Sequence, residues 1–166
     1  FSMPPWQGED FSTDVYTDDA VVRLDSFKAN VEGGIISGRY EQEKSSNVGR
    51  LSAQWENVPV KYFLEHLEYP EVVTGRITGH IDYTVDHDEP NTLRASGAFE
   101  LNDGQIQAEY MQMFFGAQSA GGLTALPPVL SFATIRSSLQ IEADHVKTPD
   151  LTIMGNGINI QGNGGF

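Results

Sequence analysis

The chain has 166 residues, a length that suits one domain or one elongated module. Its 10 Lys and Arg residues are outnumbered by 23 Asp and Glu residues, and the net charge of −13 argues against binding to nucleic acid or to anionic membrane surfaces. Without cysteine there is no disulfide framework and no thiolate chemistry. No apolar run approaches the roughly 18 residues of a membrane span, and the abrupt ends predict a fragment of a longer protein.

The first residues are rich in proline and polar side chains. They predict an arm over residues 1–13, followed by a single β-rich module over residues 14–166. Apolar residues then alternate with polar ones, at even positions up to Leu24 and at odd positions from Phe27. A shift of one residue would turn the apolar side chains to the other face, so the sequence predicts either a β-bulge or the junction of two strands here.

Gly33 and Gly34 predict a turn. We expect it to be followed by a strand over residues 36–40, a polar loop over 41–49 and a further strand over 51–55.

The next segment has the period of a helix. Its apolar residues recur at the spacing i, i+3, i+4 and i+7 and are Val60, Phe63, Leu64 and Leu67. Asn57 is the expected N-cap, Pro59 suits the first turn, and Pro70 ends the pattern. We therefore expect one clear helix near residues 58–68, with an apolar stripe that needs a partner.

The clearest strand pattern lies between residues 72 and 110. Every second residue is apolar or glycine in 77–85 and again in 93–101, which is typical of strands with one apolar and one polar face. The run of Asn, Asp and Gly at 102–104 favours a tight hairpin turn, because these residues tolerate positive φ. Alternation resumes at Ile106, so three consecutive antiparallel strands are predicted.

The pattern is weaker after Tyr110. Residues 116–128 are rich in Gly, Ala, Ser and Pro and predict a loop, and no period defines residues 111–137 as a whole. Alternation returns at 139–143, at 151–153 and at 157–162, which predicts further strands.

A short motif occurs twice. The segments 34–40 and 75–81 share the pattern G-x-I-S/T-G, followed by a basic or imidazole residue. Each copy is expected to begin a strand from a glycine turn, and repetition of such a unit is how solenoid-like proteins extend.

Several segments, taken in order, resemble one protein family. They are L-x-x-F-K-A-N-V-E-G-G-I-I-S-G-R-Y (24–40), L-S-A-Q-W-E-N-V-P-V-K-Y-F-L-E-H-L (51–67), V-T-G-R-I-T-G-H-I-D-Y (73–83), A-S-G-A-F-E-L-N-D-G-Q-I (95–106) and the tail S-S-L-Q-I-E-A-D-H-V-K-T-P-D-L-T-I-M-G-N-G-I-N-I-Q-G (137–162). This order resembles the carboxy-terminal region of AsmA-like envelope proteins of Gram-negative bacteria.

The resemblance implies long β-sheets curled into a trough with an apolar inside. It implies a periplasmic location and a parent protein anchored in the inner membrane. It also implies a role in moving phospholipid to the outer membrane or in maintaining that membrane, and the family has no catalytic residues to carry over.

One serine invites comparison with esterases. Ser119 lies in A-Q-S-A-G-G, a variant of the nucleophile-elbow signature, but that elbow needs a parallel strand before it and a helix after it. The only Asp between Ser119 and His145 is Asp144, which adjoins the histidine and cannot turn back to orient it. We interpret this segment as a loop and predict no catalytic residue.

The metal-ligating residue types also lack the spacing of a site. The acidic turn at 86–89 and the set Asp14, Asp18 and Asp19 have neither the spaced oxygens nor the glycine bend of a calcium loop. No H-E-x-x-H spacing relates His66, His80, His87 and His145. We expect solvated turns and surface or structural histidines, with no metal and no cofactor.

The remaining functional candidate is the apolar face of the sheet. A helix about 10 Å wide covers about three strands spaced at about 4.8 Å, so eight or more strands would leave apolar surface uncovered. That surplus would close into a barrel, pack on another sheet or hold a ligand, and an ordinary core and a lipid-lining groove both remain open. The expected members of this face are Ile36, Tyr40, Leu51, Trp55, Ile77, Ile81, Tyr83, Phe99, Leu101, Ile106 and Tyr110.

The sequence thus predicts a mainly β fold, in which a curved, mostly antiparallel, one-sided sheet forms a trough or a partly closed barrel. The expected function is that of a non-enzymatic cell-envelope module that shields or conducts phospholipid acyl chains between the inner and outer membranes, or supports outer-membrane assembly. Its partners would be phospholipid and other segments of the parent chain, with membrane contact only through the parent's anchor. The alternative is a closed-core β scaffold that binds a protein or glycan through its loops.

Overall fold

The computed structural model describes residues 9–66, 70–107, 128–143, 145–155 and 158–165. Nine strands form one sheet in which each strand pairs with the next along the chain, always antiparallel. The elements are β1 (Glu9–Thr17), β2 (Val21–Val31), β3 (Gly34–Glu43), β4 (Val48–Pro59), α1 (Val60–His66), β5 (Arg76–Asp86), the 3-10 turn η1 (Pro90–Thr92), β6 (Arg94–Gln107), β7 (Val129–Glu142), β8 (His145–Gly155) and β9 (Ile158–Gly165).

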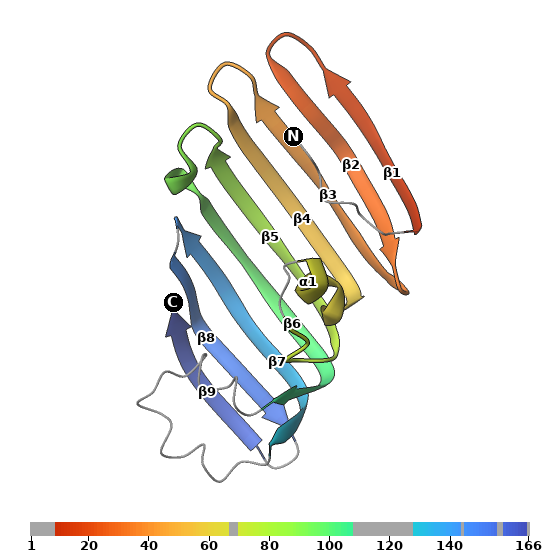
Figure 1. Cartoon of the computed structure of the whole chain (residues 1–166), viewed down its shortest axis with the longest axis vertical. Coiled ribbons are helices and arrows are strands. Elements are labelled where there is room, and N and C mark those ends of the chain that lie inside the picture. The colour runs from red at the N-terminus through yellow and green to blue at the C-terminus, as the bar shows by residue number, and fades with distance from the viewer. Residues whose placement is uncertain (1–8, 67–69, 108–127, 144, 156–157, 166) are drawn as a thin grey trace.

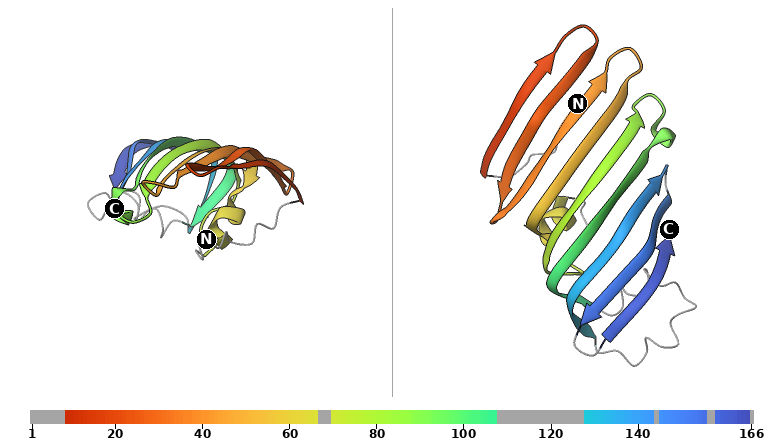
Figure 2. Two further views of the ribbon diagram at one scale, coloured as in Figure 1. Left: turned by 90° about the horizontal axis from the view of Figure 1, so that it is seen from above. Right: turned by 180° about the vertical axis from the view of Figure 1, so that it is seen from behind.

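The sheet is an open arch. Its edges are β1 and β9, which lie at opposite ends of the sheet (Figure 1). Helix α1 lies on the inner side of the arch (Figure 2), near the lower ends of β4 and β5 as drawn in Figure 1. The prediction of a curved, one-sided, antiparallel sheet with one helix is therefore confirmed, and the sheet is not closed into a barrel.

A β-bulge in β2 keeps the apolar side chains on one face. The register of β2 against β3 shifts between Leu24 and Phe27, and Ser26 has a φ of 55°. The extra residue compensates for the change from even to odd apolar positions, so Leu24 and Phe27 point the same way. Of the two alternatives predicted for this point, the bulge is confirmed.

The bulge in β4 is held by a side chain from the neighbouring strand. Asn57 has a φ of 54°, and Arg76 Nε donates to its main-chain oxygen at 2.9 Å and to its Oδ1 at 2.8 Å. Arg76 Nη2 also donates to Glu32 O in the β2–β3 turn at 2.9 Å. The N-cap role predicted for Asn57 is wrong, because β4 continues through Pro59 before the helix begins.

The hairpin turn predicted at residues 102–104 is also wrong. Strand β6 runs without interruption from Arg94 to Gln107, and Asp103 lies within it at a φ of 52°. The expectation that a residue in this Asn-Asp-Gly run adopts positive φ is met by Asp103. Its effect, however, is to change the apolar positions from odd at Leu101 to even at Ile106 inside one strand.

Other predicted boundaries move by several residues. Strand β1 begins at Glu9, inside the predicted arm, and the predicted loop at 41–49 shrinks because β3 reaches Glu43 and β4 begins at Val48. Strand β7 begins at Val129, where no period was recognised. Most of the loop predicted at 116–128, with Ser119, lies outside the described residues.

The repeated G-x-I-S/T-G motif places its second glycine opposite an aromatic ring. Gly38 pairs with Phe27 of β2, and Gly79 pairs with Trp55 of β4. A Cβ atom would lie 2.7 Å from Phe27 Cζ at Gly38 and 3.0 Å from Trp55 Cζ2 at Gly79. Glycine at these positions leaves the space that the neighbouring ring occupies, which gives the repeat a packing role.

The core lies in the half of the sheet beneath α1. One buried cluster joins the helix to β2–β4 and consists of Val31, Ile36, Val58 and Tyr62. A second cluster joins the helix to β6–β8 and consists of Val60, Leu101, Ile106, Leu130, Phe132, Ile135, Leu151 and Ile153. Trp55 and Phe63, with ring centroids 5.5 Å apart, pack beside the first cluster.

The side chain of Asp150 forms hydrogen bonds where β7 and β8 lack regular strand pairing. The register shifts between Arg136 and Gln140, and in this gap the Asp150 carboxylate accepts the Ser138 N–H at 2.6 Å and the Ser138 hydroxyl at 2.8 Å. The Ser137 hydroxyl donates to the same carboxylate at 3.2 Å. These bonds, led by that from the Ser138 N–H, lower the pKa of Asp150.

We predict that Gly79→Ala destabilises the protein by about 1–3 kcal/mol, because the added methyl group overlaps the Trp55 ring and the main chain of β6. Urea unfolding measures this change. Gly165→Ala in edge strand β9 is the matched control, since its Cβ would approach only Val146 O at 3.2 Å and Lys147 Cγ at 3.8 Å. Equal losses in the two variants would contradict the packing role of Gly79.

We predict that Asp150→Asn removes part of the acid sensitivity of folding. A lowered folded-state pKa means that the stabilisation by Asp150 is present above the unfolded pKa, near 3.8, and is lost as the pH falls through the folded value. The wild type should therefore lose more stability than the variant when unfolding is measured at decreasing pH below about 4. Asp82→Asn, which makes the same change of charge at an exposed site, is the matched control.

Candidate functional site

One row of apolar side chains crosses almost the whole sheet. Successive register partners from β1 to β8 place eight residues side by side, and we call them the open row: Val15, Leu24, Tyr40, Leu51, Tyr83, Ala95, Ile141 and Val146. Tyr40 lies four residues along β3 from Ile36 of the core, so the open row shares the face that carries α1.

A second row on the same face forms the core. Its members are Val58, Ile77, Leu101, Ile135, Ile153 and Ile160, each the register partner of the next. Val58 is 0% exposed and Leu101 is 4% exposed, whereas Val15 in the open row is 64% exposed. The other open-row residues are half-buried. The face is therefore divided into a packed half near α1 and an open half near the β3–β4 and β5–β6 turns.

The predicted members of the apolar face fall into both halves. Ile36, Leu101 and Ile106 are buried in the core clusters and present no surface to a ligand. Ile77 is a half-buried member of the core row, and Trp55, Ile81 and Phe99 are half-buried between that row and the open row. Tyr40, Leu51 and Tyr83 belong to the open row. Tyr110 lies outside the described residues.

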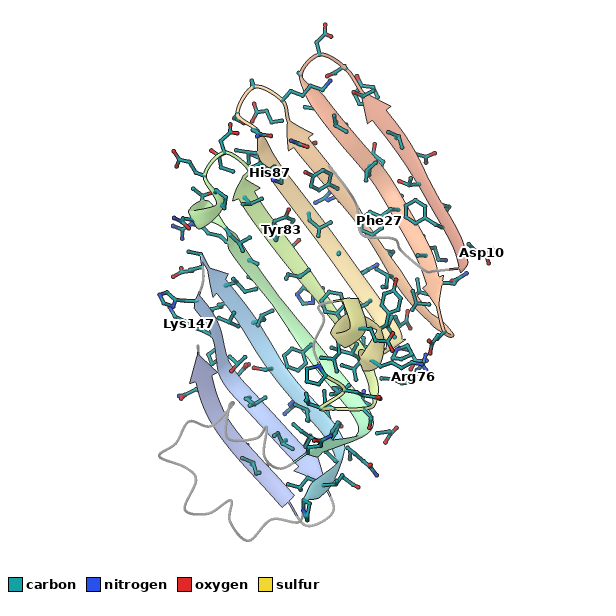
Figure 3. The ribbon with its side chains drawn as sticks, viewed as in Figure 1. Asp10, Phe27, Arg76, Tyr83, His87 and Lys147 are labelled. Carbon is teal, nitrogen blue, oxygen red and sulfur yellow. The ribbon has the colours of Figure 1, made fainter. Side chains whose placement is uncertain are left out.

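The open row has a polar rim at the turn end of the sheet. Tyr40 Oη lies 3.2 Å from His87 Nε2 and donates to Gln42 Oε1 at 3.3 Å. Asn47 Nδ2 donates to Asp88 at 2.9 Å, which joins the β3–β4 turn to the β5–β6 turn. Figure 3 shows Tyr83 and His87 in the half of the sheet away from α1.

Burial raises the pKa values of both tyrosines in the open row. Removal from water disfavours the phenolate of Tyr40 and of Tyr83, and the proximity of Tyr83 adds to the effect at Tyr40. The two rings therefore present neutral hydroxyl groups at the boundary between the apolar face and its rim.

Two of the acidic residues considered as metal ligands, Asp18 and Asp86, accept hydrogen bonds from main-chain N–H groups. Asp18 Oδ1 accepts the N–H groups of Ala20 and Val21 at 2.7 and 2.8 Å, which closes the β1–β2 turn. Asp86 Oδ1 accepts the Asp88 N–H at 2.9 Å. Among the described residues there is no group of three or more His, Asp or Glu side chains that could hold a metal ion.

The histidines are dispersed over the fold. His80 is exposed on the polar face of β5, and His145 is exposed at the start of β8. His87 lies beside Tyr40, and His66 is the last residue of α1. They share no site in the described part of the chain.

A hollow on the opposite, polar face was not foreseen from the sequence. It has a volume of about 1020 Å³, and Arg23, Arg39, Arg50 and Arg94 are among the residues that line it. Arg23 pairs with Glu41 at 2.8 Å and Arg94 with Glu142 at 3.6 Å. These residues are far apart in sequence, and only the strand register, which no local pattern reveals, brings them together.

Comparisons with protein-family models, with curated proteins and with solved structures found no match. Within the described residues, no helix is both long enough and apolar enough to cross a membrane.

The pKa of Tyr83 is raised above the value of 10.0 for a free tyrosine. We therefore predict that Tyr83→Phe removes a tyrosine ionisation that takes place at a higher pH than that of a free tyrosine. Alkaline titration followed by tyrosine absorbance measures the change. Because the folded-state pKa is raised, the stabilisation linked to this group is full below the unfolded pKa and is lost as the pH rises above it. The same titration in denaturant, where all tyrosines are exposed, is the control. A difference spectrum centred at the ordinary tyrosine pKa would contradict burial of the Tyr83 phenol.

Proposed function

We propose that this chain is a non-enzymatic cell-envelope module that shields or conducts phospholipid acyl chains. In this proposal it belongs with the AsmA-like envelope proteins that its segments resemble. It acts in the periplasm between the inner and outer membranes, as part of a parent protein anchored in the inner membrane. The observation that carries the proposal is the open row, an apolar band on a sheet that does not close.

The dimensions of the open row suit an acyl chain. Eight strands at about 4.8 Å spacing give a band about 34 Å long, roughly twice the 15 Å depth of one bilayer leaflet. Seven of its eight members are half-buried by their neighbours within the sheet, so the band retains apolar surface that an acyl chain can cover. A chain lying on it would cross the strands and contact Leu51, Tyr83 and Ala95 in turn.

The transfer of an acyl chain from water to this face needs no catalyst. Removing an acyl chain from water is worth about 0.8 kcal/mol for each fully buried CH₂ group, and an open face supplies only part of this because it covers one side of the chain. Several partly covered CH₂ groups still give a favourable transfer, and shallow binding permits release. A surface that shelters a lipid transiently therefore has to be continuous rather than deep.

In this proposal the polar face of the sheet contacts water, and the apolar face contacts acyl chains. Arg50, Thr84 and Arg94 form part of one row on the polar face and are exposed to water. The tyrosine hydroxyls and His87 at the rim supply polar groups where a lipid headgroup would meet the edge of the band.

We predict that Ala95→Glu lowers the amount of bound phospholipid by about tenfold or more, because a carboxylate in the middle of the open row loses its hydration whenever an acyl chain lies over it. Ala95 is half-buried and small, so the change spares the core. The measurement is native mass spectrometry, together with lipid extraction from equal amounts of purified protein.

The matched control is Ser96→Glu, which places the same carboxylate one residue further along β6, on the polar face. It should leave bound phospholipid unchanged, and thermal unfolding checks that both variants remain folded. Equal lipid contents in the two variants, or a wild type without phospholipid after exposure to phospholipid vesicles, would reject the proposal in favour of a scaffold that binds through its loops.

A further inference from the structure

Two adjoining hollows on the polar face hold a large share of the basic residues. The hollow of about 1020 Å³ described above shares Arg39, Ser52 and Asp82 with a second hollow of about 610 Å³. Together their linings contain 5 of the 10 Lys and Arg residues of the chain but only 4 of its 23 Asp and Glu residues. In a chain with a net charge of −13, this part of the surface is an exception. The five basic residues are Arg23, Lys28, Arg39, Arg50 and Arg94.

Two of these arginines take up three of the four acidic residues. The guanidinium of Arg23 lies 2.8 Å from Glu41 and 4.0 Å from Asp25. The guanidinium of Arg94 lies 3.6 Å from Glu142. Most of the negative charge in the linings is therefore placed beside Arg23 on β2 and Arg94 on β6.

Arg39 and Lys28 have no counterion of this kind. Both are exposed on the polar face, and neither forms a hydrogen bond or an ion pair with any residue that the structure describes. The fourth acidic residue, Asp82, is two strands away from Arg39, beyond Ser52 of β4. The guanidinium fork of Arg39 is therefore available to a ligand.

The strand register places Arg39 between two other cations. Lys28 of β2 pairs with Ser37, and Arg50 of β4 pairs with Glu41, so each is a diagonal neighbour of Arg39 on an adjoining strand. Diagonal neighbours on one face lie about 7–8 Å apart, within reach of long side chains. The ion pair of Arg50 with Glu41 is loose, at 3.9 Å. The three cations repel one another at this spacing, and a bound anion would relieve the repulsion.

We propose that Arg39, Lys28 and Arg50 bind the phosphate group of a water-soluble phosphate ester. A guanidinium fork donates to two phosphate oxygens at once, and the Lys28 ammonium is a point charge that suits the same group. The terminal oxygens of a phosphate ester are arranged tetrahedrally, so they can accept from cations on three adjoining strands, whereas a carboxylate accepts in one plane. The site lies on the face opposite the open row, so this inference does not depend on the proposed binding of acyl chains.

Hydroxyl groups lie among the three cations. Ser37 is the register partner of Lys28, and Ser52 is the register partner of Arg39. Gln54 Nε2 donates to Ser37 Oγ at 3.1 Å, so the Ser37 hydroxyl accepts that bond and can donate its own proton to a phosphate oxygen.

The charge of the chain favours a small ligand over an anionic surface. Charges in water are screened over about 8 Å at physiological ionic strength, so a small anion in the hollows interacts chiefly with the cations around it. An extended anionic surface would also meet the many acidic residues outside the hollows. We therefore assign the phosphate group to a molecule in solution rather than to a lipid headgroup.

The test is isothermal titration calorimetry with glycerol 3-phosphate. The wild type should bind it, and Arg39→Gln should weaken binding by about tenfold or more, because a charge-assisted contact with two phosphate oxygens is lost. Arg136→Gln is the matched control. It makes the same change of charge at an exposed position of β7 that lines neither hollow, and it should alter the affinity by less than about twofold.

Thermal unfolding separates a binding role of Arg39 from a structural one. Without ligand, Arg39→Gln should unfold at the wild-type temperature, because Arg39 has no partner within the described ranges. Glycerol 3-phosphate should raise the unfolding temperature of the wild type and of Arg136→Gln but not that of Arg39→Gln.

Three results would overturn the proposal. The first is a wild type that does not bind glycerol 3-phosphate at millimolar concentration. The second is an equal loss of affinity in Arg39→Gln and Arg136→Gln, which would reduce the effect to net charge. The third is binding only to phosphatidylcholine vesicles that contain phosphatidic acid, which would assign the site to a lipid surface. Phospholipid bound to the open row is measured on the same samples, so a failure of this inference and a failure of the proposed function are distinguishable.

Discussion

The structure depends on keeping one face apolar across long strands that bend. Side chains alternate between faces, so any extra residue in a strand would send the following apolar residues to the wrong side. In β2 and β4 a residue with positive φ, Ser26 or Asn57, takes up the extra position, and the apolar residues after it return to the inner face. The bulges also bend the strands, and bent strands are a physical reason for the arch of the sheet. Curvature and the separation of the faces therefore have a common origin.

The alternation of residues was enough to predict the fold class and several strands, because a period of two is a local property. It was not enough to tell a bulge from a turn. At 102–104 the apolar positions change from odd to even, which looked like a chain reversal. The change instead takes place within β6, at Asp103. In β7 the buried positions change from even at Leu130 and Phe132 to odd at Ile135, which hid the strand from a search for one period.

The candidate site was predictable only in part, for a related reason. The sequence identifies which side chains share a face, but the rows across the strands depend on register, which is a long-range property. Ile36 and Tyr40 lie on one face of β3 and appear equivalent in sequence, yet one is 3% exposed in the core and the other is half-buried in the open row. The difference comes from α1, which is too short to cover both ends of the strands it crosses.

The position of the helix is itself fixed by contacts at one end of the sheet. Lys61 pairs with Glu32 at 3.0 Å, and Arg76 binds both Glu32 O and Asn57, so the start of α1, the β2–β3 turn and the β4 bulge form one connected group. These contacts keep the helix over the core row and leave the open row to the rest of the face.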